Sequence, residues 1–309
     1  MPNCKLRAGL VVVMLMAGMG GGDNVMSGEK RPRSIRVAAV SFVPKKFHLE
    51  ANADKLEAKF REAARQGAQL AVAPEGILEG YVVNEIIAGE ADAEQMKNVA
   101  LEIDSPMIKR FRSLAKELDM CVVFGFAEKI NGDVFNCAVF IDDDGDICGR
   151  YHKMQLAEGY HDAWWFNRLG ARSRAFDTPL GRCGVMICND RWNPMLAAIP
   201  AEDGAEFLVI PSFGSRSAAQ DQAVLSRGRE NGIPVVEANV GVTLVVDQGQ
   251  ITAVDRKEDG VTLGTITVRR RSRNRSQRDK VERRFLEWRR TEMVRRYRRT
   301  LERIKSRGR

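Results

Sequence analysis

The chain has 309 residues, of which 44% are hydrophobic and 7% aromatic. This length and composition allow one large core and exclude a chain that is disordered over most of its length. The net charge of +8 is unevenly distributed, because residues 269–309 hold 19 Lys and Arg against five Asp and Glu, a net charge of +14. Residues 1–268 therefore have a net charge of −6, and the basic character belongs to a C-terminal tail.

The first 34 residues have the form of a secretory signal followed by a linker. Lys5 and Arg7 precede an apolar run at 10–17, and a glycine-rich stretch follows at 18–22. The apolar run is too short to span a bilayer comfortably. This pattern favours an exported, periplasmic protein. The alternative is a cytoplasmic protein with a loose N-terminal extension or an incorrectly assigned start.

Strands and helices alternate through the first half of the chain. The spacing of apolar residues predicts a strand at 34–40, a helix from Asn52 that stops at Gly67, a strand at 70–74, a helix at 106–118 and a strand at 121–126. Such alternation is typical of α/β proteins.

Hairpins are expected in the middle and late parts of the chain. The turn sequence at 142–145 joins two β-type runs at 134–141 and 146–152. Later apolar runs predict strands at 184–187, 207–211, 235–237, 242–246 and 261–267, with a helix near 218–230. Early alternation of strands and helices, combined with later hairpins, favours an α/β layered sandwich with a mixed sheet over a purely parallel barrel.

The basic tail predicts a long helix at 277–305, which contains neither Pro nor Gly. Its apolar stripe consists of Val281, Phe285, Trp288, Val294, Tyr297, Leu301 and Ile304. Such a stripe favours packing on the protein's own body or on a neighbouring subunit. Weak contact of the arginine-rich face with an anionic membrane or with nucleic acid is the alternative.

The six cysteines show no CxxC or Cys/His ligand spacing, so no zinc site is predicted from the spacing. Cys121, Cys137 and Cys148 lie in apolar runs and are interpreted as core residues. A disulfide between Cys183 and Cys188 is not expected, because the two lie roughly 16 Å apart on one extended strand.

Three reactive side chains each follow an apolar, β-type run. Glu75 follows the run at 70–74, Lys153 follows the run at 146–152, and Cys188 follows the run at 184–187. The carboxyl ends of strands in an α/β sheet are where chemistry is usually placed. A glutamate, a lysine and a cysteine at such positions suit nucleophilic attack on a carbonyl or nitrile carbon.

The motifs around these residues resemble those of the carbon-nitrogen hydrolases of the nitrilase superfamily. The resemblance rests on APEG at Glu75, NCAVFIDDDGDICGRYHK ending in Lys153, GVMICND around Cys188 and the later RENGIPVVEANVG, and it covers roughly residues 36–267. It implies a hydrolase domain at 35–268 that folds as a four-layer α-β-β-α sandwich, followed by the basic helical tail at 269–309. It also implies a Glu-Lys-Cys catalytic set and a homodimer or higher homo-oligomer.

The chemistry of the three side chains agrees with that resemblance. Cys188 as thiolate would attack an amide, carbamoyl or nitrile carbon, and Glu75 would transfer the protons. Lys153 and the backbone N–H of Asn189 would stabilise the oxyanion. This mechanism needs no metal and no organic cofactor. Cys183 is interpreted as structural, because it lies before the predicted strand.

Relatives of this kind often have a second glutamate bonded to the lysine, and the chain departs from that pattern. Counting back from Cys188 by the spacing of carbamoylase relatives places Asp162 at the position of this second glutamate. Glu158, five residues after Lys153, is the other candidate for the role. Asp162 is one methylene shorter than the expected glutamate.

The segment CNDRW at 188–192 is similar to that of N-carbamoyl-amino-acid hydrolases, which implies that Arg191 binds a substrate carboxylate. The alternative is a salt bridge from Arg191 to Asp190 or to a neighbouring subunit. Trp165, Trp192 and Phe213 are candidates for pocket walls, although aromatic residues at such points are often core.

The leading hypothesis is therefore a hydrolase of a small linear amide or N-carbamoyl compound that releases ammonia. A nitrilase or an aliphatic amidase is the alternative within the enzyme class. From another class, a catalytically silent scaffold docked through its basic tail stays open, although the intact reactive residues argue against it. The long hydrophobic spans of membrane acyltransferases are not found in the sequence.

Overall fold

The computed structural model describes residues 32–162 and 167–307. The signal-like segment predicted for 1–34 therefore lies almost entirely outside the described residues. The strands are β1 Arg33–Ser41, β2 Leu70–Val72, β3 Cys121–Ile130, β4 Asp133–Ile141, β5 Ile147–His152, β6 Phe176–Thr178, β7 Gly181–Val185, β8 Phe207–Ser212, β9 Val235–Asn239, β10 Val242–Asp247, β11 Gln250–Asp255 and β12 Gly260–Val268. The helices are α1 Leu49–Arg65, α2 Val83–Ala88, α3 Ala93–Val99, α4 Pro106–Leu118, the 3-10 helix η1 Cys188–Trp192, α5 Pro194–Glu202, α6 Ala218–Asn231 and α7 Arg275–Arg307.

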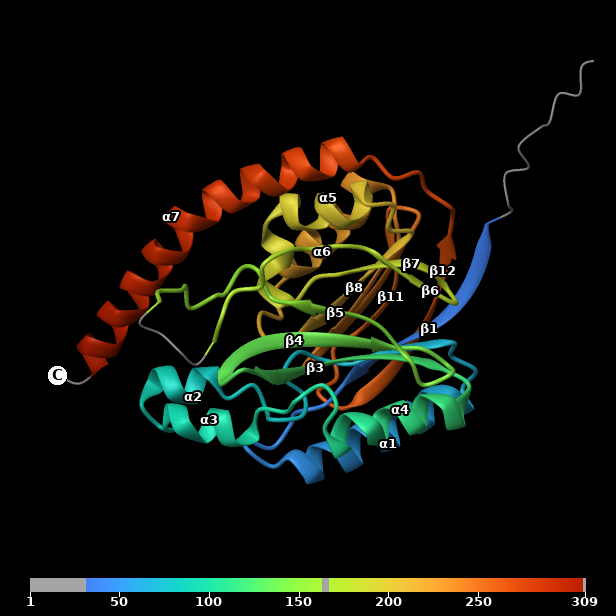
Figure 1. Cartoon of the computed structure of the whole chain (residues 1–309). Helices are drawn as coiled ribbons and strands as arrows, with labels where there is room; N and C mark the ends of the chain where they lie inside the picture. Colours follow the sequence, from blue (N-terminus) through green and yellow to red (C-terminus); the bar gives the residue numbers. More distant parts are fainter. Residues whose placement is uncertain (1–31, 163–166, 308–309) are drawn as a thin grey trace, which may run out of the picture. The chain divides into compact units, whose positions relative to one another are not determined.

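Two six-stranded mixed sheets face each other in the domain (Figure 1). Their strand orders are β12-β1-β2-β3-β4-β5 and β11-β10-β9-β8-β7-β6. In each sheet three neighbouring strands are parallel, and every strand outside this group pairs antiparallel with the strand next to it. Because β3, β4 and β5 alternate in direction, β5 runs the same way as β2 and β3. The carboxyl ends of β2 and β5 therefore lie at the same edge of the first sheet.

Apolar side chains fill the space between the sheets and the space under the helices. Val37 and Val123 of the first sheet share one core with Leu208 and Val236 of the second sheet. On the outer face of the first sheet, α1 and α4 bury a second core that includes Phe60. Helices α5 and α6 contact strands of the second sheet. The four layers α-β-β-α confirm the fold class expected from the sequence, as Figure 1 shows.

Local signals define these elements where the sequence contains them. Helix α4 begins after Ser105, whose hydroxyl accepts a hydrogen bond from the N–H of Ile108 at 3.4 Å, and Pro106 occupies its first turn. The strand predicted at 184–187 begins earlier, so Cys183 lies within β7 and not before it. Strands β6 and β11 and the short helices α2, α3 and α5 are not predicted from the sequence. The three helices span only six to nine residues, too few to establish a helical period.

The basic tail forms one helix, α7, which packs against α5 of the same chain. Phe285, Met293 and Thr300 are buried, at intervals of two turns along the helix. Trp288 and Ile304, which the sequence placed on the apolar stripe, are 36% and 37% exposed. The intramolecular packing expected for the tail is thus present, and contact with an anionic surface stays a prediction. None of the helices in the described residues is long and apolar enough to cross a membrane.

Candidate active site

Glu75 lies in the turn that follows β2, at the edge shared with β5, and its side chain is fully buried. The backbone of Gly125 on β3 passes directly beneath it and donates to the carbonyl of Pro74 at 3.0 Å. A Cβ at position 125 would lie 2.6 Å from the Cα of Glu75, so only glycine fits there. The sheet therefore fixes the position of this carboxylate.

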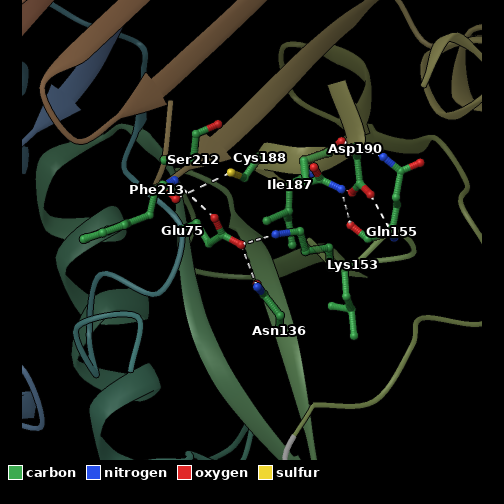
Figure 2. Close-up of polar contacts among 12 residues, drawn as sticks. Glu75, Asn136, Lys153, Gln155, Ile187, Cys188, Asp190, Ser212 and Phe213 are labelled. Carbon is green, nitrogen blue, oxygen red and sulfur yellow. Dashed lines mark hydrogen bonds and ion pairs between the residues drawn. The ribbon is translucent and has the colours of Figure 1, made fainter. Parts of the chain in front are cut away.

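Three donors hold the carboxylate of Glu75 (Figure 2). Lys153 Nζ donates to Oε1 at 2.5 Å, and Asn136 Nδ2 donates to the same oxygen at 2.6 Å. The backbone N–H of Phe213 donates to Oε2 at 3.1 Å. Asn136 and the peptide group of Phe213 were assigned no such role from the sequence. Asn136 lies in the motif NCAVF, so a signal for it was present.

Lys153 follows β5 and is buried against the same carboxylate. Its backbone N–H donates to the carbonyl of Asn136 at 2.9 Å, and its ammonium lies 5.8 Å from the centre of the Tyr81 ring. Burial alone would lower the pKa of Lys153, but the nearby negative charges, Glu75 first among them, raise it well above its ordinary value. The lysine is therefore a fixed positive charge at neutral pH.

Cys188 begins η1, three residues after the end of β7. Its φ of 46° lies in the left-handed region, which is strained for a residue with a side chain. Sγ donates to the carbonyl of Phe213 at 3.6 Å. Burial raises the pKa of the Cys188 thiol to about 11, and the charge of Glu75 adds to the increase, although Lys153 and Arg191 oppose it. The resting side chain is a thiol that needs a base.

The peptide group of Phe213 joins the two reactive groups. Its N–H binds the carboxylate of Glu75, and its carbonyl accepts from the thiol of Cys188. Figure 2 shows the side chains of Glu75, Lys153 and Cys188 turned toward one another around this peptide. The three residues that the sequence predicted as a set are therefore brought together in one buried site.

Asp190 anchors the loop that presents the cysteine. Oδ2 accepts from the N–H of Ile187 at 2.9 Å and from the hydroxyl of Tyr151 at 2.9 Å, and Oδ1 accepts from the N–H of Gln155 at 3.0 Å. Burial raises the pKa of Asp190 to about 6. Asn189, predicted as a supporting residue, donates from Nδ2 to the carbonyl of Gln155 at 3.1 Å. These contacts tie η1 to the segment that follows Lys153.

The two acidic residues considered as partners of the lysine occupy different environments. Glu158 is buried, accepts from Asn167 Nδ2 at 2.7 Å, and acts electrostatically on Lys153. Burial raises the pKa of Glu158, whereas Lys153 lowers it. Asp162 is exposed and accepts from the hydroxyl of Tyr160 at 3.1 Å. The structure therefore favours Glu158.

Arg191 lies in a different environment from the one expected of a residue that binds a substrate carboxylate. Its side chain is 1% exposed, and NH1 donates to Glu237 Oε1 and to Ser212 Oγ, both at 2.8 Å. Arg191 therefore forms a salt bridge within the protein, which was the alternative to binding a substrate carboxylate. Its partner is Glu237 and not Asp190. The sequence could not reveal this pair, since its members are 46 residues apart.

The aromatic candidates for pocket walls also differ from one another. Phe213 is half-buried and stacks on Tyr81 with ring centres 5.2 Å apart, so it borders the site. Trp192 is 43% exposed, and its ring centre lies 5.8 Å from the guanidinium carbon of Arg191. Trp165 lies outside the described residues.

A cavity of about 270 Å³ lies beside the site. It is lined by Tyr81, Asn84, Ile87, Ala157, Glu158, Thr300, Arg303 and Ile304. Tyr81 and Glu158 are neighbours of Lys153, while the last three residues belong to α7. The tail helix thus supplies one wall of this neighbouring cavity, which Glu75, Lys153 and Cys188 do not line.

A layered α/β sandwich that brings together a buried carboxylate and ammonium from the first sheet and a thiol from the second sheet provides the groups that a thiol-dependent hydrolase requires. Residues 36–273 match the family model of the carbon-nitrogen hydrolases, and the chain belongs to this family, within the nitrilase superfamily. An N-carbamoylputrescine amidase of Oryza sativa subsp. japonica is 33% identical over 233 residues, which cover 74% of this chain and 71% of that relative. A citrullinase of Francisella tularensis subsp. tularensis is 29% identical over 218 residues, which cover 67% of this chain and 74% of that relative.

Solved structures share the fold at lower sequence identity. An amidase from Nesterenkonia sp. AN1 has a TM-score of 0.63 at 21% identity and covers 75% of this chain and 90% of its own. Saccharomyces cerevisiae Nit3, described as a member of the nitrilase superfamily, has a TM-score of 0.64 at 20% identity. The match covers 76% of this chain and 90% of Nit3. These likenesses confirm the nitrilase-like fold.

The environment of Cys188 predicts how its alkylation depends on pH. With a pKa of about 11, the thiolate fraction rises about tenfold for each pH unit between roughly pH 7 and pH 10. We expect the rate of modification of Cys188 by iodoacetamide to rise in the same proportion, measured by peptide mass spectrometry. Cys183, fully buried, serves as an unreactive internal control. A rate that levels off above about pH 9 would show an ordinary thiol, with a pKa of about 8.5, and contradict this account.

Proposed function

We propose that the protein hydrolyses a carbon–nitrogen bond in a small linear amide or N-carbamoyl compound, with Cys188 as the nucleophile. The observation that supports this most directly is the shared peptide of Phe213, which binds the carboxylate of Glu75 and the thiol of Cys188. This contact places a base next to a nucleophile, and Lys153 lies on the other oxygen of the base.

In the first half of the proposed reaction, Sγ of Cys188 attacks the carbonyl carbon of the substrate. Glu75 accepts the thiol proton during the attack, since a thiol with a pKa of about 11 is protonated at neutral pH. The carbon–nitrogen bond then breaks, and Glu75 passes the proton to the leaving nitrogen. The products of this half are the free amine or ammonia and a thioester on Cys188.

In the second half, water replaces the leaving group. Glu75 accepts a proton from the water as its oxygen attacks the thioester carbon, and the proton returns to the sulfur as the carbon–sulfur bond breaks. An amide substrate yields a carboxylic acid. An N-carbamoyl substrate that has lost its amine yields carbamic acid, which decomposes to carbon dioxide and ammonia.

Lys153 has two roles in this proposal. Its ammonium orients Glu75 through the 2.5 Å hydrogen bond, and it provides a positive charge for the oxyanion that forms on the attacked carbonyl. The backbone N–H of Asn189 is the second proposed donor. Loss of one such donor costs on the order of 10²-fold in rate.

The substrate class is inferred from the relatives and from the cavity. Two relatives are named for N-carbamoylputrescine and for citrulline, which both contain a carbamoyl group on nitrogen. The cavity of about 270 Å³ would receive the part of the substrate beyond the reacting carbon. Glu158 and Arg303 on its wall could bind charged or polar groups there. A small compound with a polar distal end fits these features.

Ammonia release from a panel of ureido acids, linear amides and nitriles tests the proposal. We expect the wild-type protein to release ammonia from at least one N-carbamoyl compound or amide. Cys188→Ala should reduce the rate by at least about 10⁴-fold, because it removes the nucleophile. Cys183→Ala, the matched control, should keep most of the activity.

The same panel separates the alternatives. Turnover of nitriles alone would identify a nitrilase, and turnover of simple aliphatic amides alone an aliphatic amidase. A folded protein that releases ammonia from nothing in the panel would favour the scaffold hypothesis. Activity that persists in Cys188→Ala would exclude the proposed mechanism.

Glu158 and Asp162 form a matched pair that tests which acidic residue supports the lysine. Glu158→Gln should lower kcat by about tenfold, because Lys153 loses a buried negative neighbour and its position against Glu75 loosens. Asp162→Asn should leave kcat almost unchanged, since that side chain is exposed. Steady-state kinetics on the preferred substrate measure both effects, and the reverse ranking would refute the assignment of Glu158.

A further inference from the structure

Three side chains of the kinds that bind transition metals meet on the first sheet, outside the site described above. The ligand atoms of Glu128, Cys137 and His152 all lie within 4.8 Å of one another. They come from β3, β4 and β5, respectively. No step of the proposed hydrolysis uses any of the three.

The register of the strands fixes this cluster. Cys137 and His152 are direct cross-strand partners on β4 and β5. On the other side of β4, Cys137 pairs with Phe126, and Glu128 is two residues further along β3 on the same face. The ligand atoms are therefore positioned by paired backbone and not by a flexible loop. No spacing rule in the sequence detects this arrangement, because the ligands lie on three separate strands.

The cluster is buried on one side and accessible on the other. Glu128 and Cys137 are fully buried, whereas the side chain of His152 is 21% exposed. Nε2 of His152 lies 2.5 Å from Oε2 of Glu128, and the imidazole packs against Phe135 with ring centres 4.7 Å apart. Arg150 binds the other oxygen of Glu128 from the exposed edge. An ion could therefore enter on the side of His152, with the carboxylate already oriented.

We propose that Glu128, Cys137 and His152 form a binding site for a divalent transition-metal ion of the zinc type. A nitrogen, a sulfur and one carboxylate oxygen match the ligand preference of zinc, whereas calcium and magnesium prefer oxygen ligands alone. Binding replaces the thiol proton of Cys137 and leaves His152 neutral. The short contact between His152 and Glu128 would open as both bind an ion at about 2.0–2.2 Å, and a water would complete the tetrahedral set.

The location of the cluster connects it to the hydrolytic site. Side chains alternate between the two faces of a strand, so Asn136 and Lys153, the neighbours of Cys137 and His152, point to the opposite face. These two residues hold Oε1 of Glu75, and the N–H of Lys153 donates to the carbonyl of Asn136. An ion bound to Cys137 and His152 would therefore lie on the opposite face of the sheet from Asn136 and Lys153. Each of these two residues, which orient Glu75, is the chain neighbour of one of the proposed ligands.

Titration of the full-length protein with Co²⁺, followed by displacement with Zn²⁺, tests the proposal. We expect about one equivalent of Co²⁺ to produce the near-ultraviolet absorption of a cobalt–thiolate bond, and Zn²⁺ to abolish it. Cys137→Ala should eliminate this absorption. His152→Gln should weaken Zn²⁺ binding by at least about tenfold, measured by competition with a chromophoric chelator.

Matched controls separate this site from the other thiols and from the hydrolytic site. Cys148→Ser, which alters a half-buried thiol on β5, and His48→Gln should both bind the metal as the wild type does. Cys188→Ala should lose hydrolysis but keep the cobalt absorption, so the failure of one proposal can be told from the failure of the other.

Folding of the variants is checked by circular dichroism without metal. If Cys137→Ala proves unstable, the Zn²⁺ affinity of His152→Gln tests the site instead. This variant is expected to fold, because the side chain at position 152 is partly exposed and glutamine can still hydrogen bond to Glu128. A cobalt–thiolate band that survives Cys137→Ala, or Zn²⁺ affinity that is unchanged in His152→Gln, would overturn the proposal. Absence of any cobalt–thiolate band in the wild-type protein would overturn it as well.

Discussion

The buried ion pair between Glu75 and Lys153 is the interaction on which the site depends. Both side chains are fully buried, and a buried charge without a partner costs several kcal/mol, so each residue requires the other. The pair also keeps the lysine charged, because the neighbouring Glu75 raises the pKa of Lys153. Cys188 then lies next to a base whose position is fixed before any substrate arrives, and this arrangement reduces the reorganisation that attack requires.

The sequence was sufficient to predict the parts of the fold that local patterning determines. Helix α4 is predicted at about the residues that it occupies, since Ile108, Phe111, Leu114 and Ala115 recur at helical spacing. Glu75, Lys153 and Cys188 could be singled out because each follows an apolar run, and the resemblance of the surrounding motifs identified the family. The short helices after β2 could not be predicted, because six or seven residues are too few to distinguish a helical period from chance.

Contacts that depend on strand register were beyond prediction. Asn136 reaches Glu75 only because β4 and β5 place it next to Lys153, and Arg191 finds Glu237 only after β9 is paired with β8. The choice of Glu158 over Asp162 also needed coordinates, since counting along the chain does not follow the path of the loop. The same reason hid the cluster at His152, whose ligands come from three separate strands.

The central claim is that the carboxylate, the ammonium and the thiol act as one unit, and a double-mutant cycle tests it most directly. The quantity to measure is kcat/KM for the preferred substrate in wild type, Glu75→Gln, Lys153→Met and the double variant. Because the carboxylate and the ammonium act together in the same attack on the carbonyl carbon, we predict that the double variant is about as impaired as the more damaging single variant. Losses that multiply would show two independent contributions and contradict the account.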